Sequence, residues 1–251
     1  MPVLTGSLAP AVAPRGESER LAALLSRLYA EQHALTPDDP YMAEHARERV
    51  VSGQVAAFDW YRPLLPPTGA VLDWGCNHAP DSCLLRAAAG DRYALHACDY
   101  REPGHFAAFH DFAGIAYTRL THLYQLPYGD AQYDAVVASG VLEHAAWDYE
   151  SLKELYRVLK PGGVLVVTYL PNRFSVQEWL LRVVRKAGYH RRLYDLAATR
   201  RMLLGTGFEV MEARFQATLR GGWSGAALRA IPGLAALSSV LCFVARKRDS
   251  M

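Results

Sequence analysis

The sequence has 251 residues, of which 51% are apolar, so it can form one substantial hydrophobic core. Its 27 basic residues nearly balance its 25 acidic ones, which argues against nucleic acid or an anionic membrane as the main partner. The four cysteines form no CxxC pair and predict free thiols in a reducing compartment, without a disulfide framework or a metal site.

The N-terminal part of the chain predicts two helical stretches, over residues 17–32 and 41–65. We expect residues 1–62 to form a helical extension and residues 63–251 to form the main domain, with an inserted lid at 220–238. The first residues lack a basic stretch followed by a long apolar run, so no secretion signal is expected. Arg229 and Pro232 interrupt a late apolar segment, which argues against a membrane span. A soluble, cytoplasmic protein is therefore predicted.

From residue 70 onward, short apolar runs alternate with helical patterns. The predicted strands cover residues 70–74, 93–99, 115–120, 133–139, 164–170, 208–215 and 239–247. The predicted helices between them cover residues 80–89, 103–111, 149–159, 175–188 and 194–205. Continuous apolar runs are typical of parallel strands that are covered on both faces. The pattern predicts an α/β fold with a doubly wound, mostly parallel seven-stranded sheet, a Rossmann-like arrangement.

The stretch "VLDWGCNHAPDS", residues 71–82, predicts a strand that runs through a tight turn into a helix. Such loops bind nucleotides, but this one keeps only Gly75, with Asn77 and Ala79 where further glycines are usual. Asn is the non-glycine residue that best tolerates a left-handed backbone, so the turn can still form. Asp73 would repel a phosphate and attract a cation. The loop therefore favours a nucleoside with a positive group over a dinucleotide.

Further polar residues follow the predicted strands, at the edge of the sheet where ligands of such folds bind. Asp99 ends the second strand, 26 residues after Asp73, where a carboxylate can accept hydrogen bonds from both hydroxyls of a ribose. Glu143 and His144 follow the fourth strand. Helix capping explains part of the pattern, because Asp81 lies in a first helical turn.

These segments together resemble a known family. "VLDWGCNHA", "HACDY", "LPYGDAQYDAVVASGVLEH" and "LKPGG", in this order, are similar to the core of class I S-adenosylmethionine-dependent methyltransferases. The likeness is closest to the small-molecule branch with the ubiquinone, menaquinone, natural-product and sugar enzymes. It covers residues 68–172 closely and continues through 190–210. It implies S-adenosyl-L-methionine as the cofactor and S-adenosyl-L-homocysteine as the product.

The resemblance also implies roles for individual residues. The expected cofactor-binding residues are Asp73, Gly75, Cys76, Asn77, Asp99, Tyr100, His122, Leu123 and Ser139. In the family, the first acidic residue and glycine border the methionyl part, the acid that closes the second strand binds the ribose, and the next residue lies beside the adenine. His122-Leu123 replaces the usual Asp-Ala near the adenine, so only a backbone contact of Leu123 is expected there.

His144 is the expected catalytic residue, because an imidazole can remove a proton from a hydroxyl acceptor at neutral pH. A histidine that only packs beside the cofactor is the alternative. Asn172, His190 and Tyr194 are expected to contact the substrate, although an ordinary helix start would also explain the last two. The acceptor expected from the resemblance is a small molecule, a secondary metabolite or a sugar, methylated on oxygen or nitrogen.

Two other functions stay open. The first is a non-catalytic relative that binds S-adenosylmethionine and acts as a partner or scaffold. The second is a nicotinamide-dependent oxidoreductase, which the missing glycines of the loop disfavour. No nucleic-acid partner and no stable membrane insertion are expected, and a homodimer is left open.

Overall fold

The computed structural model describes residues 15–185, 190, 192–216, 237 and 240–248. Its centre is a seven-stranded sheet in the order β3-β2-β1-β4-β5-β7-β6. The strands are β1 (Gly69–Trp74), β2 (Tyr93–Asp99), β3 (Ala116–Arg119), β4 (Tyr133–Ser139), β5 (Leu159–Pro171), β6 (Phe208–Gln216) and β7 (Val240–Lys247). Only β7 runs antiparallel to its neighbours β5 and β6. The predicted doubly wound, mostly parallel sheet is confirmed.

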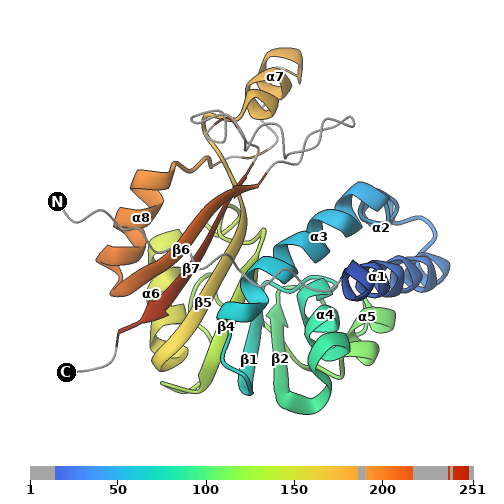
Figure 1. The fold of residues 1–251 in the computed structure, drawn as a ribbon, viewed down its shortest axis with the longest axis horizontal. Coiled ribbons are helices and arrows are strands. Elements are labelled where there is room, and N and C mark those ends of the chain that lie inside the picture. The colour runs from blue at the N-terminus through green and yellow to red at the C-terminus, as the bar shows by residue number, and fades with distance from the viewer. Residues whose placement is uncertain (1–14, 186–189, 191, 217–236, 238–239, 249–251) are drawn as a thin grey trace.

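Helices cover both faces of the sheet (Figure 1). They are α1 (Arg15–Leu35), α2 (Pro40–His45), α3 (Glu48–Tyr61), α4 (Pro80–Ala89), α5 (Ala107–Ala113), α6 (Asp148–Val158), α7 (Val176–Arg185) and α8 (Leu196–Gly205), with 3₁₀ turns at Arg62–Leu64 and Gly90–Arg92. Successive residues of a strand face opposite sides. Val71 accordingly joins the core under α1, α3, α4 and α5, whereas Leu72 joins the core under α6 and α8.

Several element boundaries differ from the predicted ones. The second N-terminal stretch is divided into α2 and α3, because the chain leaves the helical conformation at Arg47. The segment Leu159–Gly163 belongs to β5, since Leu159 pairs with Tyr133 across a register shift. The helix predicted over 103–111 begins only at Ala107 and ends at Ala113, before Gly114, which has a left-handed backbone.

The N-terminal helices share their core with the sheet. Leu25 and Phe58 are fully buried in the same cluster as Val71. The helices are joined by polar contacts as well: Arg62 pairs with Glu17 at 2.8 Å. The predicted boundary at residue 62 stays a prediction, and the predicted lid at 220–238 lies outside the described residues except for Leu237.

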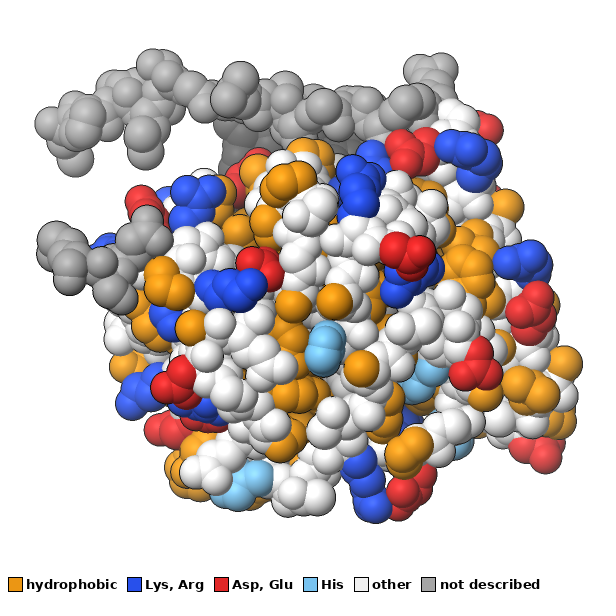
Figure 2. All heavy atoms as spheres, turned by 90° about the horizontal axis from the view of Figure 1, so that it is seen from below, with side chains coloured by type: hydrophobic (Ala, Val, Ile, Leu, Met, Phe, Trp, Pro, Cys, Tyr) orange, Lys and Arg blue, Asp and Glu red, His pale blue; other side chains and the backbone are white. Residues whose placement is uncertain are grey.

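The face seen from below in Figure 1 intersperses acidic and basic side chains (Figure 2). This mixture agrees with the balanced charge of the sequence. In the part of the chain that the structure describes, no helix is both long and apolar enough to cross a bilayer.

Candidate functional site

The loop after β1 has the tight backbone that the sequence predicts. Asn77 has a φ of 48°, which confirms its left-handed conformation, and Ala79 is left-handed as well, with a φ of 57°. Gly75 has a φ of 66°, and a Cβ atom there would lie 2.4 Å from Cγ1 of Val141. The chain therefore needs glycine at position 75, whereas Asn77 and Ala79 adopt their conformations with side chains present.

Hydrogen bonds to two neighbouring elements hold this loop. The backbone amides of Gly75 and Cys76 donate to the carbonyl oxygen of Cys98, at 2.8 and 3.1 Å. Nε2 of His110 lies 2.8 Å from the carbonyl oxygen of Asn77, so this imidazole donates from Nε2. The loop is thus fastened to β2 and α5.

His78 connects the loop to the N-terminal helices. It is buried, and its Nε2 lies 2.7 Å from the hydroxyl of Tyr29 in α1. The rings of Tyr41, Phe106 and Phe109 pack around it. Burial lowers the pKa of His78 well below its usual value, so its imidazole is neutral at neutral pH.

Asp99 lies at the carboxyl end of β2 beside this loop. Its Oδ2 accepts a hydrogen bond from the amide of Asn77 at 3.0 Å, and its Oδ1 accepts one from the amide of Arg101 at 3.2 Å. A carboxylate can accept about four hydrogen bonds. Among the contacts that the described residues make, two acceptor positions therefore remain, which is the number that the two hydroxyls of a ribose require.

A pair of buried carboxyl groups lies on the other side of the loop. Asp73 accepts a hydrogen bond from Ser82 Oγ at 2.7 Å, and Asp81 accepts one from Tyr61 at 2.6 Å. Burial and the neighbouring Asp81 raise the pKa of Asp73, and burial also raises the pKa of Asp81. A ligand that carries a positive charge would lower both pKa values and stabilise the pair.

Tyr100 and His122 come together on the outer side of β2 and β3. The hydroxyl of Tyr100 donates to the carbonyl oxygen of His122 at 2.8 Å. The His122 ring accepts from the amides of Tyr124 and Gln125 through Nδ1, so this atom is not free for a ligand. Tyr100 and Leu123 expose 50% and 59% of their surface, and both can contact a ligand.

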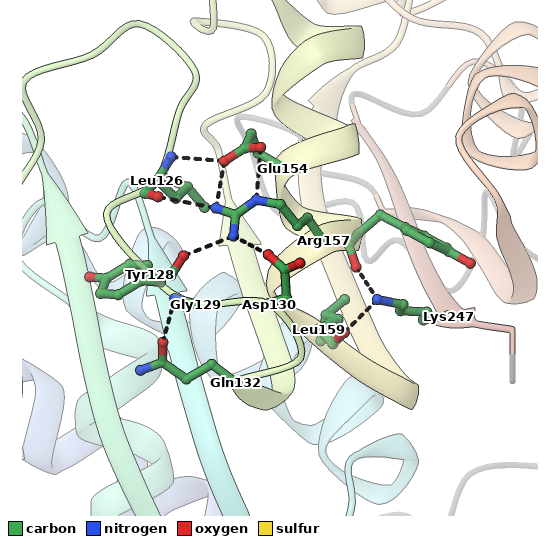
Figure 3. Close-up of polar contacts among 10 residues, drawn as sticks. Leu126, Tyr128, Gly129, Asp130, Gln132, Glu154, Arg157, Leu159 and Lys247 are labelled. Carbon is green, nitrogen blue, oxygen red and sulfur yellow. Dashed lines mark hydrogen bonds and ion pairs between the residues drawn. The ribbon is translucent and has the colours of Figure 1, made fainter. Parts of the chain in front are cut away.

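The segment after Leu123 is held by Arg157 of α6 (Figure 3). Its guanidinium donates to the carbonyl oxygens of Leu126 and Tyr128, at 3.1 and 2.8 Å. It also binds the carboxylates of Glu154 and Asp130, at 2.8 and 2.7 Å. These bonds raise the pKa of Arg157, and they fix the loop that follows the predicted adenine contact.

Ser139 ends β4, and its hydroxyl accepts a hydrogen bond from Thr168 at 2.8 Å. Ser139 lowers the pKa of Asp81, so the end of β4 lies beside the buried carboxyl pair. Tyr169 follows in β5 with an unusual φ of 63°, and its hydroxyl donates to the carbonyl oxygen of Gly53 in α3 at 3.0 Å. The ends of β4 and β5 therefore meet α3 near the carboxyl pair.

Glu143 and His144 lie in the turn after β4. The carboxyl group of Glu143 is buried and its Oε2 contacts no described hydrogen-bond donor, and burial raises its pKa to about 8. The His144 side chain is 67% exposed, and its Nε2 lies 3.9 Å from Glu143 Oε1. Its ring centre is 6.3 Å from that of His190, whose Nδ1 binds Glu178 at 2.8 Å. The structure thus brings His144 and His190 together.

Asn172 and Tyr194 adopt more internal positions. Asn172 is completely buried, and its side-chain oxygen accepts from the amide of Phe174 at 3.2 Å. The hydroxyl of Tyr194 donates to the carbonyl oxygen of Leu142 at 3.0 Å, directly before Glu143. Both residues therefore shape the segments that carry Glu143 and His190.

Reasoning from the sequence gave Tyr61, Tyr169 and His78 no role in the site. The first two reach it from α3 and β5, and no local motif marks them. Asp81 lies in the first turn of α4, as predicted, and its carboxylate also accepts a hydrogen bond from Tyr61. Within the described ranges, no group of three His, Cys, Asp or Glu side chains is placed to hold a metal ion.

Comparison with known proteins identifies the family. Residues 42–213 match a family described as a methyltransferase domain, and this match covers more than half of the chain. The chain belongs to the methyltransferase family. A probable S-adenosylmethionine-dependent methyltransferase of Mycolicibacterium smegmatis is 33% identical over 143 residues, 56% of this chain. The chain spans about half of that relative, 52% of its length.

Solved structures of methyltransferases share the fold. One is the 1,6-didemethyltoxoflavin-N1-methyltransferase of Burkholderia thailandensis with bound 1,6-didemethyltoxoflavin and S-adenosylhomocysteine; it has a TM-score of 0.57 and 18% identity, over 96% of this chain and 93% of that one. Another is a possible histamine N-methyltransferase of Thermotoga maritima, with a TM-score of 0.57 and 17% identity, over 78% and 89%. The predicted methyltransferase family and the predicted fold are confirmed.

The residues of this methyltransferase domain fit S-adenosylmethionine. Asp99 has two open acceptor positions for the ribose, and Asp73 and Asp81 form a buried acidic pair for a cationic group. A pyrophosphate would meet this acidic pair directly, which the pair disfavours. These carboxylates therefore match a nucleoside with a positively charged amino-acid part.

Proposed function

We propose that this methyltransferase domain transfers a methyl group from S-adenosylmethionine to an oxygen or nitrogen atom of a small molecule, a secondary metabolite or a sugar. The observation that carries the proposal is Asp99, whose carboxylate closes β2 next to the left-handed turn and has two acceptor positions left. The structural similarity to a 1,6-didemethyltoxoflavin-N1-methyltransferase and to a possible histamine N-methyltransferase supports a small acceptor.

In this proposal Asp99 holds the ribose, while Tyr100 and Leu123 flank the adenine. Asp73 and Asp81 face the amino-acid part, with Gly75, Cys76, Asn77 and Ser139 forming the adjacent wall. The exposed ring of Tyr100 can stack on a base because it is fixed through its hydroxyl to His122. We infer no side-chain hydrogen bond from His122 to the adenine, because its Nδ1 already accepts two amides.

Bound S-adenosylmethionine supplies a methyl group that its sulfonium makes electrophilic. The protein then has to orient the acceptor atom in line with the S–CH₃ bond and to remove a proton from it. We assign the proton transfer to His144. Although the side chain is 67% exposed, partial desolvation of the ring and the neighbouring His190 lower its pKa, so its imidazole is neutral and able to accept a proton at neutral pH.

Glu143 is less suited to this role at neutral pH. Its pKa of about 8 keeps most of its carboxyl groups protonated at pH 7, so it can donate a hydrogen bond but seldom accepts a proton. We infer that Glu143 supports the acceptor site, and that His190 contacts the acceptor beside His144. Asn172 and Tyr194 hold the two segments that carry these residues.

The test is a screen for S-adenosylhomocysteine formation with phenols, sugars and primary amines, repeated with His144→Ala. We expect the variant to lower kcat for a hydroxyl acceptor about 100-fold while the Kd for S-adenosylhomocysteine stays unchanged. Cofactor binding without turnover of any acceptor would favour a non-catalytic partner. Binding of NADH in place of S-adenosylhomocysteine would favour an oxidoreductase.

A further inference from the structure

Helix α7 exposes an unusual amount of apolar surface. Val176, Trp179 and Val183 are 45%, 63% and 60% exposed, and Phe174, just before the helix, is 57% exposed. The three helical residues follow the i, i+3, i+7 spacing of one helix face. In Figure 1, α7 projects beyond the end of the sheet, away from the helices that cover its two faces. We call these four residues the α7 apolar face.

One polar residue of this helix, Glu178, points toward the protein. Glu178, two positions after Val176 and thus on the opposite side of the helix, is buried. Its carboxylate binds Nδ1 of His190 at 2.8 Å. A helix that packs on a globular domain usually buries its apolar side and exposes its polar one. Val176, Trp179 and Val183 lie on the side of α7 away from Glu178, and this exposed apolar side is accessible to a further surface.

The charges around this face are positive. Residues 173–185 contain three arginines and one acidic residue, and that residue is the buried Glu178. Arg173 lies over the ring of Phe174, with its guanidinium carbon 5.5 Å from the ring centre. Arg182 is exposed, and its guanidinium donates to the carbonyl oxygen of His190 at 3.1 Å. Arg173 also pairs with Asp195 at 3.3 Å, while its side chain stays 56% exposed. Two cationic groups thus border the apolar side chains, and one of them has an acidic partner.

We propose that the α7 apolar face lies on the surface of an anionic lipid bilayer. Amphipathic helices that bind there place Trp, Phe and aliphatic side chains among the acyl chains and their basic residues at the head groups. Trp179 and Phe174 suit this interface because aromatic rings accumulate at it. Arg173 and Arg182 can reach phosphates while their methylene groups stay in the apolar layer.

A second copy of the chain is a poorer partner for this face. A two-fold contact would bring the arginines of two copies together, and like charges across an interface oppose association. The helix has 10 residues, and such a helix is about 15 Å long. A helix face of this length is too small to bury by itself the roughly 800 Å² per partner that a stable protein interface buries. An anionic bilayer offers acyl chains to the apolar side chains and negative charge to the arginines.

The experiment is co-sedimentation of the full chain with vesicles of phosphatidylcholine alone or of phosphatidylcholine with phosphatidylglycerol. Trp179→Asp and Val183→Asp are compared with Leu35→Asp, because Leu35 in α1 is also 63% exposed but lies outside α7. We expect binding to the anionic vesicles, reduced about tenfold by either α7 substitution and by high salt, and unchanged by Leu35→Asp. Binding of S-adenosylhomocysteine and the thermal transition show that each variant is folded.

Three results would overturn the proposal. One is no sedimentation with anionic vesicles; another is equal sedimentation of the α7 variants and the wild-type protein. The third is a wild-type dimer in light scattering that Trp179→Asp converts to a monomer, because a second copy would then cover the face. The proposal does not depend on methyl transfer, so it can fail or hold independently of the proposed function.

Discussion

The substitution Asp99→Ala tests the cofactor site most directly. It removes the two acceptor positions that we assign to the ribose hydroxyls, and also the acceptors of the Asn77 and Arg101 amides. A hydrogen bond to a charged group contributes about 1.5–3 kcal/mol. Allowing for water that replaces part of the lost contacts, we expect binding to weaken by about 3 kcal/mol, which raises Kd about 100-fold.

Calorimetric titration with S-adenosylhomocysteine and with 5′-methylthioadenosine measures this effect. Both ligands contain the ribose, so both should lose affinity for Asp99→Ala. Asp99→Asn keeps one oxygen acceptor and should lose less. Asp91→Ala is the control, since the Asp91 side chain is fully exposed at a turn. A Kd of Asp99→Ala within twofold of the wild-type value would refute the assignment of Asp99 to the ribose.

Three further predictions concern the loop and its surroundings. Asp81→Asn should weaken the binding of S-adenosylhomocysteine about tenfold in calorimetry. It should leave the binding of 5′-methylthioadenosine unchanged, because that ligand lacks the amino-acid part. Equal losses of affinity for both ligands would contradict a role at the ammonium group. Gly75→Ala should lower the free energy of unfolding by about 2 kcal/mol or more in urea denaturation, because its Cβ would overlap Val141. Gly53→Ala is the matched control, with no atom within 4 Å of the new Cβ, and should not destabilise. Because the pKa of Glu143 is raised to about 8, its carboxyl group ionises in the unfolded chain at a lower pH than in the folded protein. The free energy of unfolding should therefore fall as the pH rises from 4.5 to 8. Urea denaturation of Glu143→Gln should show a smaller fall.

The sequence predicted the sheet well because its signals are local. β4 and α4 occupy the predicted residues 133–139 and 80–89, since a continuous apolar run marks the strand and Pro80 with Asp81 marks the start of the helix. The strand character of Leu159–Gly163 was missed, because proline and glycine usually end an element. Pairing with Tyr133 nevertheless extends β5 through this segment.

The candidate site was only partly predictable, because several of its contacts join distant parts of the chain. Tyr61 reaches Asp81 over 20 positions, and Tyr29 reaches His78 over 49. Such contacts depend on how α1 and α3 pack against α4, and a helical pattern gives only the buried side of each helix. Residue types at strand ends could be predicted, whereas the bonds between them required the packed structure.

The glycine-poor loop illustrates how tertiary contacts replace local preference. A left-handed conformation costs a non-glycine residue about 1–2 kcal/mol, so Asn77 and Ala79 together store a few kcal/mol of strain. Two hydrogen bonds of the Asn77 backbone offset part of this strain. Its amide donates to Asp99 and its carbonyl oxygen accepts from His110, and each bond contributes about 1 kcal/mol. Within this loop, Val141 occupies the place that a side chain at Gly75 would take. The loop can therefore keep the conformation of a cofactor-binding turn with a single essential glycine, and its other glycines become dispensable where no pyrophosphate approaches the backbone.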